Sequence, residues 1–421
     1  MIILVRSVHP MTRTSGTGLA APAGVGIMFA SNGALFAALL PWYPLLTQRL
    51  GLSAAEFGIV VAAFAVGAIA SSALPAPLIA RFGATPVVIA GTALVGLAVA
   101  GAAWATSGWM LAAAIFLIGF FDAIVDVAQN LAGIRVQELA GRSILSSLHA
   151  LWSLGGVASG AIATLAAANG MDVRFFLAAA AVAGVVLVIV GDRLVGRAAD
   201  APAAETGGSA RGGGARKVVF LAALPLIAIA IGGTMLEDVA NNWAAMSAVR
   251  IGGMPVALAG LAFTVTIGSQ CIGRFSGDLL IARFGRAAVA RVGGFLIATG
   301  ALLVVTTHEQ VATLLLGLAL AGYGSATLVP SAMTAAAALP GVSAGAGVTL
   351  VSWLMRVGFL VTSPVIGALT DATSLRWGLC VLVVVGVTVS LLAPSLAAAP
   401  APVRSSRRVE TRRDRGRPAA R

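Results

Sequence analysis

Ionisable side chains inside long apolar stretches are the residues of this sequence with the clearest chemistry. A charge in the hydrocarbon of a membrane costs on the order of a few kcal/mol, so such residues indicate a function or an ion pair. Carboxylates in this setting can take up and release protons, and an arginine can hold an anionic or polyhydroxylated molecule through its planar set of donors. The sequence holds seven such residues: Asp122, Asp126, Glu237, Asp238, Arg274, Asp278 and Arg356.

Asp122, Asp126 and Asn130 follow one another at intervals of four residues. This spacing places them on one face of a helix, and a polar stripe on an apolar helix is expected to face a wet cavity and not lipid. We therefore predict proton coupling at Asp122 and Asp126. An alternative is that Asp126 and Asn130, which are expected nearer the inner surface, pair with Arg135 or Arg142 as a clamp there.

Glu237 and Asp238 are adjacent carboxylates at the expected outer end of another apolar stretch. Neighbouring carboxylates disfavour joint ionisation, which suits a proton-coupling site, although the same pair could be a solvated helix end. Arg356 is expected near the membrane midplane, where it needs an anionic partner. We predict that this partner is Asp122 across the two halves of the chain, or a bound solute.

Arg274 and Asp278 are four residues apart, and we predict that they form a structural ion pair on one helix. Amides and aromatic rings in other stretches are candidates for solute binding, because amides hydrogen-bond to polar solutes and rings stack on them. Each aromatic residue has the alternative role of an anchor at the membrane interface. The predicted solute-binding residues are Asn32, Gln129, Asn130, Trp152, Gln270, Tyr323, Trp353 and Arg356.

Residue types and their spacing exclude several kinds of site. Lys217 is the only lysine and lies in Gly-Ala-Arg-Lys, so the chain has no Gly-Lys-Ser/Thr loop for ATP phosphates. The three histidines are far apart and both cysteines lie in apolar runs, so we predict no metal, no cofactor and no disulfide. No Ser/His/Asp set is recognisable, which argues against an enzyme. Eight of the 27 basic residues lie in the last 18 positions, so the net charge of +12 indicates no nucleic-acid partner.

The elements that must position these residues are membrane-spanning helices. Of the 421 residues, 59% are hydrophobic and 10% are charged, which leaves too few polar residues to cover a water-facing surface. We predict an all-α membrane protein whose twelve spans have about 20 residues each. The spans are predicted at 24–46, 56–80, 86–106, 109–131, 147–168, 174–195, 218–242, 256–281, 288–307, 310–332, 346–368 and 377–398.

Basic residues fall mostly on one side of the predicted membrane. With the N-terminus inside, 21 of the 27 lysines and arginines lie in the inner segments and four lie in the outer ones. Since basic residues accumulate in cytoplasmic loops, we predict that both termini are cytoplasmic. The predicted organisation is a cytoplasmic tail (1–23), two six-helix halves (24–195 and 218–398), a cytoplasmic linker (196–217) and a basic, disordered cytoplasmic tail (399–421).

A sequence repeat relates the two halves. Leu-Ile-Ala-Arg-Phe-Gly occurs at 78–83 and again at 280–285, and the same offset of 202 residues maps Arg174 onto Arg376. Because this offset maps an inner loop onto an inner loop, we predict that the halves are parallel repeats, related by an axis along the membrane normal.

The repeated loop resembles the signature of the major facilitator superfamily, which carries Asp-Arg-x-Gly-Arg. The matching residues are Arg81, Gly83, Arg283, Gly285 and Arg286. Both copies depart from the signature, because Ala80 and Ala282 stand at the position of its Asp. Three further stretches, at 126–130, 146–156 and 273–278, look like those of the bacterial MosC-like subgroup.

The resemblance implies the major facilitator fold, with twelve transmembrane helices in two parallel six-helix halves, in a bacterial inner membrane. It also implies a secondary transporter, and the intramembrane carboxylates favour protons as the coupling ion. We expect a monomer in the lipid bilayer that moves a small polar organic solute by alternating access. Two alternatives stay open. One is an exporter of amphipathic compounds, although the Gly-Pro signature of drug antiporters is absent from 147–168, and the other is a transport-inactive membrane sensor or scaffold.

Overall fold

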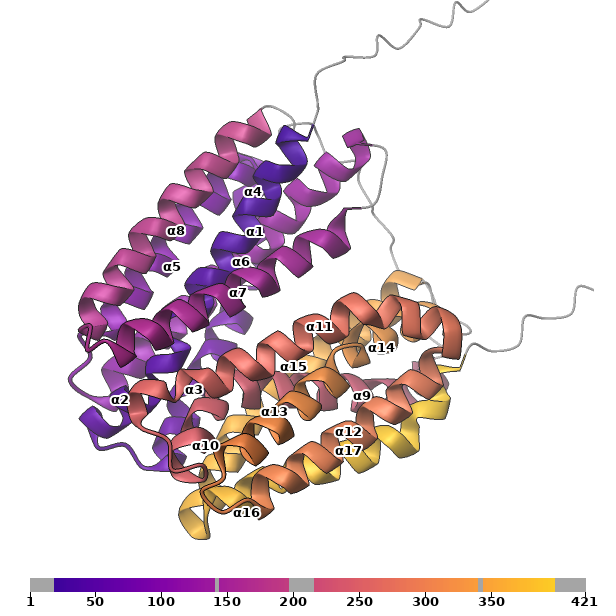
Figure 1. Cartoon of the computed structure of the whole chain (residues 1–421). Coiled ribbons are helices and arrows are strands. Elements are labelled where there is room, and N and C mark those ends of the chain that lie inside the picture. The colour runs from indigo at the N-terminus through magenta and orange to yellow at the C-terminus, as the bar shows by residue number, and fades with distance from the viewer. Residues whose placement is uncertain (1–18, 141–143, 197–215, 340–343, 398–421) are drawn as a thin grey trace, which may run out of the picture.

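Helices make up the fold (Figure 1). The structure is a computed structural model that describes residues 19–140, 144–196, 216–339 and 344–397, and these residues form no strand. The helices, with 3₁₀ segments labelled η, are α1 (Ala20–Ala38), η1 (Leu40–Trp42), α2 (Tyr43–Leu50), α3 (Ala54–Ala70), α4 (Pro75–Phe82), α5 (Ala84–Ala102), α6 (Gly108–Ala140), α7 (Leu145–Ala168), α8 (Val173–Val195), α9 (Arg216–Asn242), α10 (Ala244–Arg250), η3 (Val256–Leu258), α11 (Gly260–Phe284), α12 (Arg286–Thr306), α13 (Val311–Ser325), α14 (Leu328–Ala337), α15 (Ala344–Ala372), α16 (Leu375–Leu379), α17 (Val381–Leu392) and η4 (Ala393–Leu396).

The described residues form twelve segments that are long and apolar enough to cross a membrane. Eleven are single segments, and the twelfth is α3 followed by α4, which are bent by 57° at the break between them. Pro75 begins α4, and a proline has no amide hydrogen with which to continue the hydrogen bonding of a preceding helix. The predicted all-α fold with twelve spans is confirmed.

The ends of several spans differ from the predicted ones. α1 begins at Ala20, four residues before the predicted start, and α6 continues to Ala140 although the predicted span ends at 131. A span predicted from apolar content ends before polar residues such as Gln137 and Glu138. The helix itself can continue past the hydrocarbon into water. Most of the predicted linker and all of the predicted C-terminal tail lie outside the described residues.

The helices form two bundles, α1 to α8 and α9 to α17 (Figure 1). The same helix pairs recur in both bundles. Packing of α1 on α7 and α8 corresponds to packing of α9 on α15 and α17, and packing of α5 on α6 and α8 corresponds to packing of α12 on α13 and α17. Glycines allow the closest crossings, since a Cβ on Gly33 would lie 2.1 Å from the backbone oxygen of Trp152. Parallel repeats require this recurrence of pairs.

The repeated loop has the same conformation in both halves. Gly83 has φ = 88° and Gly285 has φ = 80°, which is a region that favours glycine, and each joins two helices. In each copy the arginine of Arg-Phe-Gly stacks on the phenylalanine that follows it. The Arg81 guanidinium lies 5.2 Å from the centroid of the Phe82 ring, and the Arg283 guanidinium lies 5.3 Å from that of Phe284. The sequence repeat is therefore also a structural repeat.

The two bundles meet most closely through α3 with α15 and α7 with α11. A Cβ on Gly58 would lie 2.3 Å from the backbone oxygen of Ser363. Asp371, near the end of α15, accepts hydrogen bonds from the backbone amides of Ala54 (2.9 Å) and Ala55 (3.0 Å) at the start of α3. We call this end of the molecule, marked by the contact of Asp371 with α3, the sealed end. Figure 1 shows the bundles diverging from it toward the last residues of α6 and α11.

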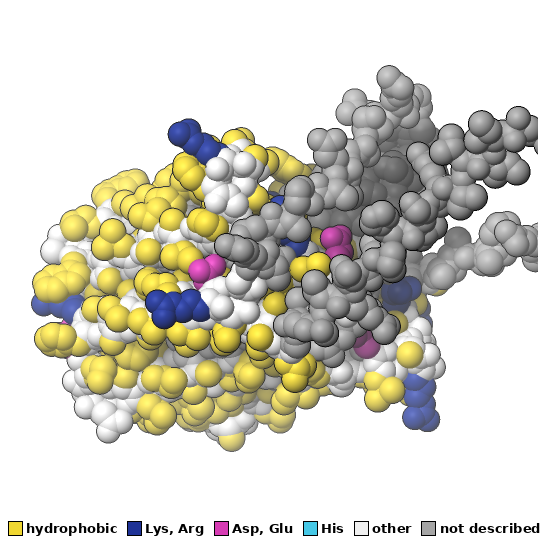
Figure 2. All heavy atoms as spheres, turned by 90° about the horizontal axis from the view of Figure 1, so that it is seen from above, with side chains coloured by type: hydrophobic (Ala, Val, Ile, Leu, Met, Phe, Trp, Pro, Cys, Tyr) yellow, Lys and Arg dark blue, Asp and Glu magenta, His cyan; other side chains and the backbone are white. Residues whose placement is uncertain are grey.

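The surface of the two bundles is apolar. Hydrophobic side chains cover most of the visible described surface in Figure 2, and charged side chains are isolated among them. Large apolar side chains from both halves, such as Leu97, Phe175 and Leu391, are well exposed. An apolar surface of this extent is typical of a protein surrounded by lipid.

Candidate functional site

Asp122 on α6 is joined to α1 and α7 by a chain of hydrogen bonds. Asn32 Nδ2 donates to Asp122 Oδ1 (2.9 Å), and Trp152 Nε1 donates to Asn32 Oδ1 (2.7 Å). Asn32 is 3% exposed, and with both of its amide atoms engaged its orientation is fixed. A predicted proton-coupling residue, Asp122, and two predicted solute-binding residues, Asn32 and Trp152, thus form one unit, which we call the first carboxylate network.

Asp126 and Asn130 contact each other within α6. Asn130 Nδ2 donates to the backbone oxygen (2.8 Å) and to Oδ1 (3.0 Å) of Asp126. Asp126 is exposed, whereas Gln129 is completely buried inside the first bundle. Asp122, Asp126 and Asn130 therefore form the polar stripe expected on α6. Gln129, which was predicted to bind solute, is buried and does not reach the surface of the bundle.

Asp238 on α9 is the centre of a second carboxylate network. Its Oδ1 accepts a hydrogen bond from Asn242 Nδ2 (2.9 Å), and its Oδ2 accepts one from the Ser363 hydroxyl on α15. Trp243 Nε1 donates to the same Ser363 Oγ at 2.9 Å. Asp238 is 4% exposed, so both of its oxygens are satisfied by the protein and not by water.

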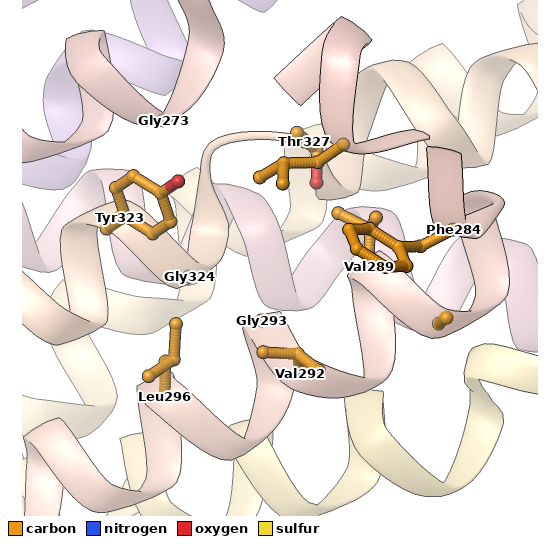
Figure 3. A pocket seen from close by; sticks show the side chains of 11 residues that line it. Gly273, Phe284, Val289, Val292, Gly293, Leu296, Tyr323, Gly324 and Thr327 are labelled. Carbon is orange, nitrogen blue, oxygen red and sulfur yellow. The ribbon is translucent and has the colours of Figure 1, made fainter. Parts of the chain in front are cut away.

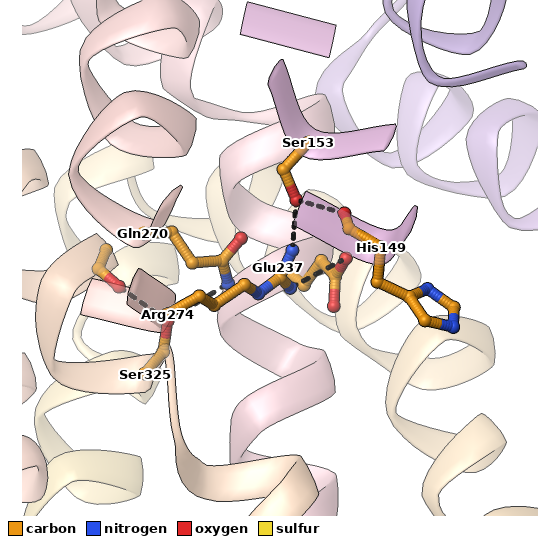
Figure 4. A network of polar contacts seen from close by, with 7 residues as sticks. His149, Ser153, Glu237, Gln270, Arg274 and Ser325 are labelled. Atoms are coloured by element: carbon orange, nitrogen blue, oxygen red, sulfur yellow. Dashed lines mark hydrogen bonds and ion pairs between the residues drawn. The ribbon is translucent and has the colours of Figure 1, made fainter. Parts of the chain in front are cut away.

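Arg274 on α11 links the two halves (Figure 4). Its Nη1 donates to Ser153 Oγ on α7 at 2.7 Å, and its Nη2 lies 3.8 Å from Glu237 Oε1 on α9. The structure differs here from the ion pair predicted between Arg274 and Asp278. Asp278 is exposed, whereas Glu237 and Ser153 offer partly buried partners, and the guanidinium reaches them instead.

The remaining predicted residues have separate environments. Gln270 Nε2 donates to Ser325 Oγ (3.2 Å) beside Arg274 (Figure 4). The Tyr323 hydroxyl shares a hydrogen bond with Ser276 Oγ (2.9 Å), and the ring lines a different pocket inside the second bundle. Trp353 and Arg356 on α15 are both exposed.

Arg356 does not form the ion pair predicted with Asp122. Within the described residues, the ion pair that forms joins Arg274 to Glu237. Arg356 is exposed on α15, and no ion pair joins it to Asp126 either within the described residues.

A cavity lies between the two halves. Phe36, Tyr43 and Phe64 line it from the first half, and Asp238 and Asn241 line it from the second, together with Leu40, Val61, Ala65, Asn242 and Phe359. The Phe36 ring lies 5.4 Å from that of Phe64 and 6.0 Å from that of Trp152, centroid to centroid, so the cavity wall adjoins the first carboxylate network. The side chains that line this cavity are aromatic, aliphatic, amide and carboxylate groups, and none is basic.

Several residues of this site were missed by the sequence analysis. Three of them are phenylalanines in apolar runs, where the sequence cannot distinguish a ring that lines a cavity from a ring packed in the core: Phe36, Phe64 and Phe359. Ser363 and Asp371 belong to α15 and act on other helices through contacts that no local spacing reveals. The described residues contain no group of three or more His, Cys, Asp or Glu side chains that could hold a metal ion.

The chain resembles three curated bacterial proteins. It is 24% identical to an uncharacterized MFS-type transporter of Yersinia pestis over 358 residues, which are 85% of this chain and 91% of that protein. It is 29% identical to the uncharacterized transporter y4wD of Sinorhizobium fredii over 89% of this chain and 97% of that protein. It is 32% identical to the membrane protein MosC of Rhizobium meliloti over 158 residues, which are 37% of this chain and 39% of MosC. No protein-family model matches the chain.

Solved transporter structures share the fold. The nucleoside transporter NupG superposes with a TM-score of 0.68 at 15% identity, over 89% of this chain and 98% of that one. A bacterial homolog of the lysosomal transporter Spinster gives 0.67 at 14% identity, over 89% and 96% of the two chains. The chain thus has the fold of multi-pass membrane transporters, and its curated full-length relatives are transporters, which are not enzymes. In sequence, the chain is similar to an MFS-type transporter and, over part of its length, to MosC, as its loop signature suggested.

Proposed function

We propose that the chain is a proton-coupled secondary transporter that moves a small polar organic solute across the bacterial inner membrane by alternating access. The observation that carries the proposal is the first carboxylate network beside the cavity. Asp122 accepts an amide hydrogen bond from Asn32, and no cation is paired with it among the described residues. A negative charge without a cation is costly inside a membrane, so a proton is a suitable partner for this carboxylate.

The network also offers a path from proton to solute. Asn32 connects Asp122 to Trp152, and Trp152 contacts Phe36 in the cavity wall. A change of protonation at Asp122 would alter the hydrogen bond to Asn32 and hence the position of the Trp152 ring. Proton and solute could then bias the same conformational equilibrium, which is the thermodynamic requirement for coupling.

The side chains around the cavity support a restricted class of solute. Aromatic rings favour a flat or partly apolar body, and the amides of Asn241 and Asn242 favour hydrogen-bonding groups on it. With a carboxylate and no basic side chain in the lining, the cavity suits a neutral or cationic molecule better than an anionic one. The rings of Phe36, Phe64 and Phe359 also favour a second candidate, an exporter of amphipathic compounds.

A screen for ligand-induced stabilisation tests the solute class. The purified chain would be heated with sugars, polyols, organic acids and hydrophobic cations at two pH values. We expect stabilisation by a neutral or cationic polar solute that depends on pH, because a ligand that binds the folded state raises its stability. Stabilisation by hydrophobic cations alone would favour the exporter, and stabilisation by organic acids alone would contradict the proposal.

The orientation is part of the proposal. If both termini are cytoplasmic, the sealed end of Asp371 and α3 faces outward and the structure is an inward-facing conformation. The excess of basic residues on the inner side supports this orientation. Reporter fusions at Gly208 and at the C-terminus, both outside the described residues, are expected to report cytoplasm. An external signal at either site would contradict the proposed orientation.

A further inference from the structure

A second cavity lies inside the second half, away from the space between the halves (Figure 3). Its walls are the last turns of α11, with Leu280 and Phe284, and the first turns of α12, with Ala288 and Val292. Tyr323 on α13 contributes to its base. The lining is almost entirely hydrocarbon, and its polar side chains are Thr327 and Tyr323, whose hydroxyl is hydrogen-bonded to Ser276.

Backbone contacts at glycines explain why this groove exists. A Cβ on Gly293 of α12 would lie 2.4 Å from the backbone oxygen of Gly324 on α13, so these two helices meet without side chains between them. A Cβ on Gly273 of α11 would lie 2.9 Å from the backbone oxygen of Tyr323 on the same α13. α11 and α12 therefore each pack on α13, and a groove is left between their facing sides.

The groove opens at the molecular surface next to two cations. Phe284 and Val292 in its walls are each 58% exposed. The Arg283 guanidinium lies 5.3 Å from the centroid of the Phe284 ring. Phe284 also lines an adjoining pocket together with Gly285 and Arg286. An apolar groove thus ends at a pocket that carries positive charge.

The length of the groove matches one leaflet of a bilayer. Its lining residues on α11 run from Gly273 to Phe284. At about 1.5 Å per residue this is about 16 Å, or roughly half of a hydrocarbon core ~30 Å thick. The arginines lie at the end where α11 stops and α12 begins, which is where the head groups of that leaflet are expected.

We propose that this groove binds an anionic phospholipid of the adjacent leaflet, with one acyl chain between α11 and α12 and the phosphate held by Arg283 and Arg286. An acyl chain in the groove would contact apolar side chains that no other part of the protein covers. Two guanidinium groups at its end select a negatively charged head group over a zwitterionic one. The site is separate from the cavity between the halves, with which it shares no lining residue.

The other half supplies a matched control. Arg81 stacks on Phe82 as Arg283 stacks on Phe284, in the same Arg-Phe-Gly sequence. However, α4 is bent by 57° from α3, whereas α11 runs unbroken to its end, so the straight wall of the groove is not repeated there. Arg81→Gln thus removes an equivalent charge without altering the groove.

The experiment measures lipid retained by the purified full-length chain, by native mass spectrometry and by melting temperature. The probes are phosphatidylglycerol and phosphatidylcholine with identical acyl chains. The variants are the double change Arg283→Gln with Arg286→Gln, the charge-preserving double change to Lys, the groove-filling Ala288→Trp, and Arg81→Gln. Every variant keeps the arginine-rich C-terminal segment, so the attraction of this segment to anionic lipid is the same in all of them.

We expect phosphatidylglycerol to be retained and to raise the melting temperature more than phosphatidylcholine in the unmodified chain. The Gln double variant should weaken phosphatidylglycerol binding about 30-fold, since each surface cation contributes about fivefold. The Lys double variant should restore most of it, Arg81→Gln should not change it, and Ala288→Trp should reduce retention of both lipids. Equal binding of phosphatidylglycerol to the unmodified chain and the Gln double variant would overturn the proposal. Equal loss in Arg81→Gln, or full retention in Ala288→Trp, would overturn it too.

Discussion

The two halves share one helix packing but hold their buried carboxylates differently. In the first half, Asp122 accepts a hydrogen bond from Asn32, which is itself bound by Trp152. In the second half, both oxygens of Asp238 accept hydrogen bonds, from Asn242 and from Ser363. A carboxylate whose two oxygens are both bound is fixed, whereas one attached through a single amide can change its charge or partner more easily.

The repeat shows where the halves diverged. The offset of 202 residues maps Asn32 onto Thr234, and Thr234 Oγ1 donates to the backbone oxygen of Met355 on α15 (2.9 Å). The contact between α1 and α7 at Asn32 therefore recurs between α9 and α15 without an acid, because the position of Asp122 is occupied by Gly324. The same scaffold places a coupling candidate in one half and a rigid polar contact in the other.

The largest expected effect comes from Asp122→Asn. The variant keeps the side-chain shape and a hydrogen-bonding oxygen for Asn32 but cannot exchange a proton at this position. We expect it to abolish accumulation of solute against a gradient while exchange or binding is partly retained. The measurement is pH-driven uptake and counterflow in proteoliposomes.

Arg356→Ala provides the comparison across the halves, because it removes a cation from α15 of the second half, whereas Asp122→Asn removes an anion from α6 of the first. We expect it to damage both accumulation and exchange. Normal accumulation by Asp122→Asn with unchanged pH dependence would show that α6 is not the coupling helix. The assignment would then pass to Glu237 and Asp238.

Asp238→Ala is expected to act mainly on stability. Removing the carboxylate leaves the buried Ser363 hydroxyl and the Asn242 amide without their acceptor, and each unpaired group costs energy. We expect a loss of about 2–4 kcal/mol in the free energy of unfolding, whereas Asp122→Ala should cost less. Denaturation of both variants in the same detergent measures the difference. Equal losses would mean that the two networks are equally rigid.

The sequence was sufficient for the fold and for part of the site. Apolar content, the repeat of Arg-Phe-Gly and the family resemblance predicted twelve spans in two parallel halves, because these features can be recognised in a sequence without knowing which helices contact each other. The spacing on α6 identified Asp122, and composition suggested Asn32 and Trp152 as binding residues, but no sequence feature indicated that the three form one network. Arg274 was assigned to Asp278 on its own helix, since i,i+4 spacing is visible in a sequence while the approach of α9 and α7 is not.

A smaller effect is expected at the sealed end. Asp371 accepts hydrogen bonds from the first amides of α3, where a negative charge also interacts favourably with the helix dipole. Asp371→Asn should weaken this contact between halves and favour opening about two- to fivefold. The measurement is the labelling rate, from the predicted outer side, of a cysteine placed at Asn241 in a chain that lacks Cys271 and Cys380.

Asp172→Asn is the matched control for this experiment. Asp172 caps α8 by accepting from the Arg174 amide (2.7 Å), so it also places a carboxylate at a helix start, but within one half. If both variants label at the same rate as the unmodified chain, the contact of Asp371 does not hold the halves together.

The smallest effect is expected from removing the C-terminal segment. The segment lies outside the described residues, and its eight arginines from Arg404 onward come with few apolar residues, so from composition we expect it to contribute no buried hydrocarbon. The last described helix, η4, ends at Leu396, and the residues of both carboxylate networks come before it. Truncation after Ala401 should therefore leave expression, melting temperature and uptake unchanged, while attachment of the separate segment to anionic vesicles should persist. A well-expressed truncation that has lost uptake would show that transport depends on this segment as well as on the two halves.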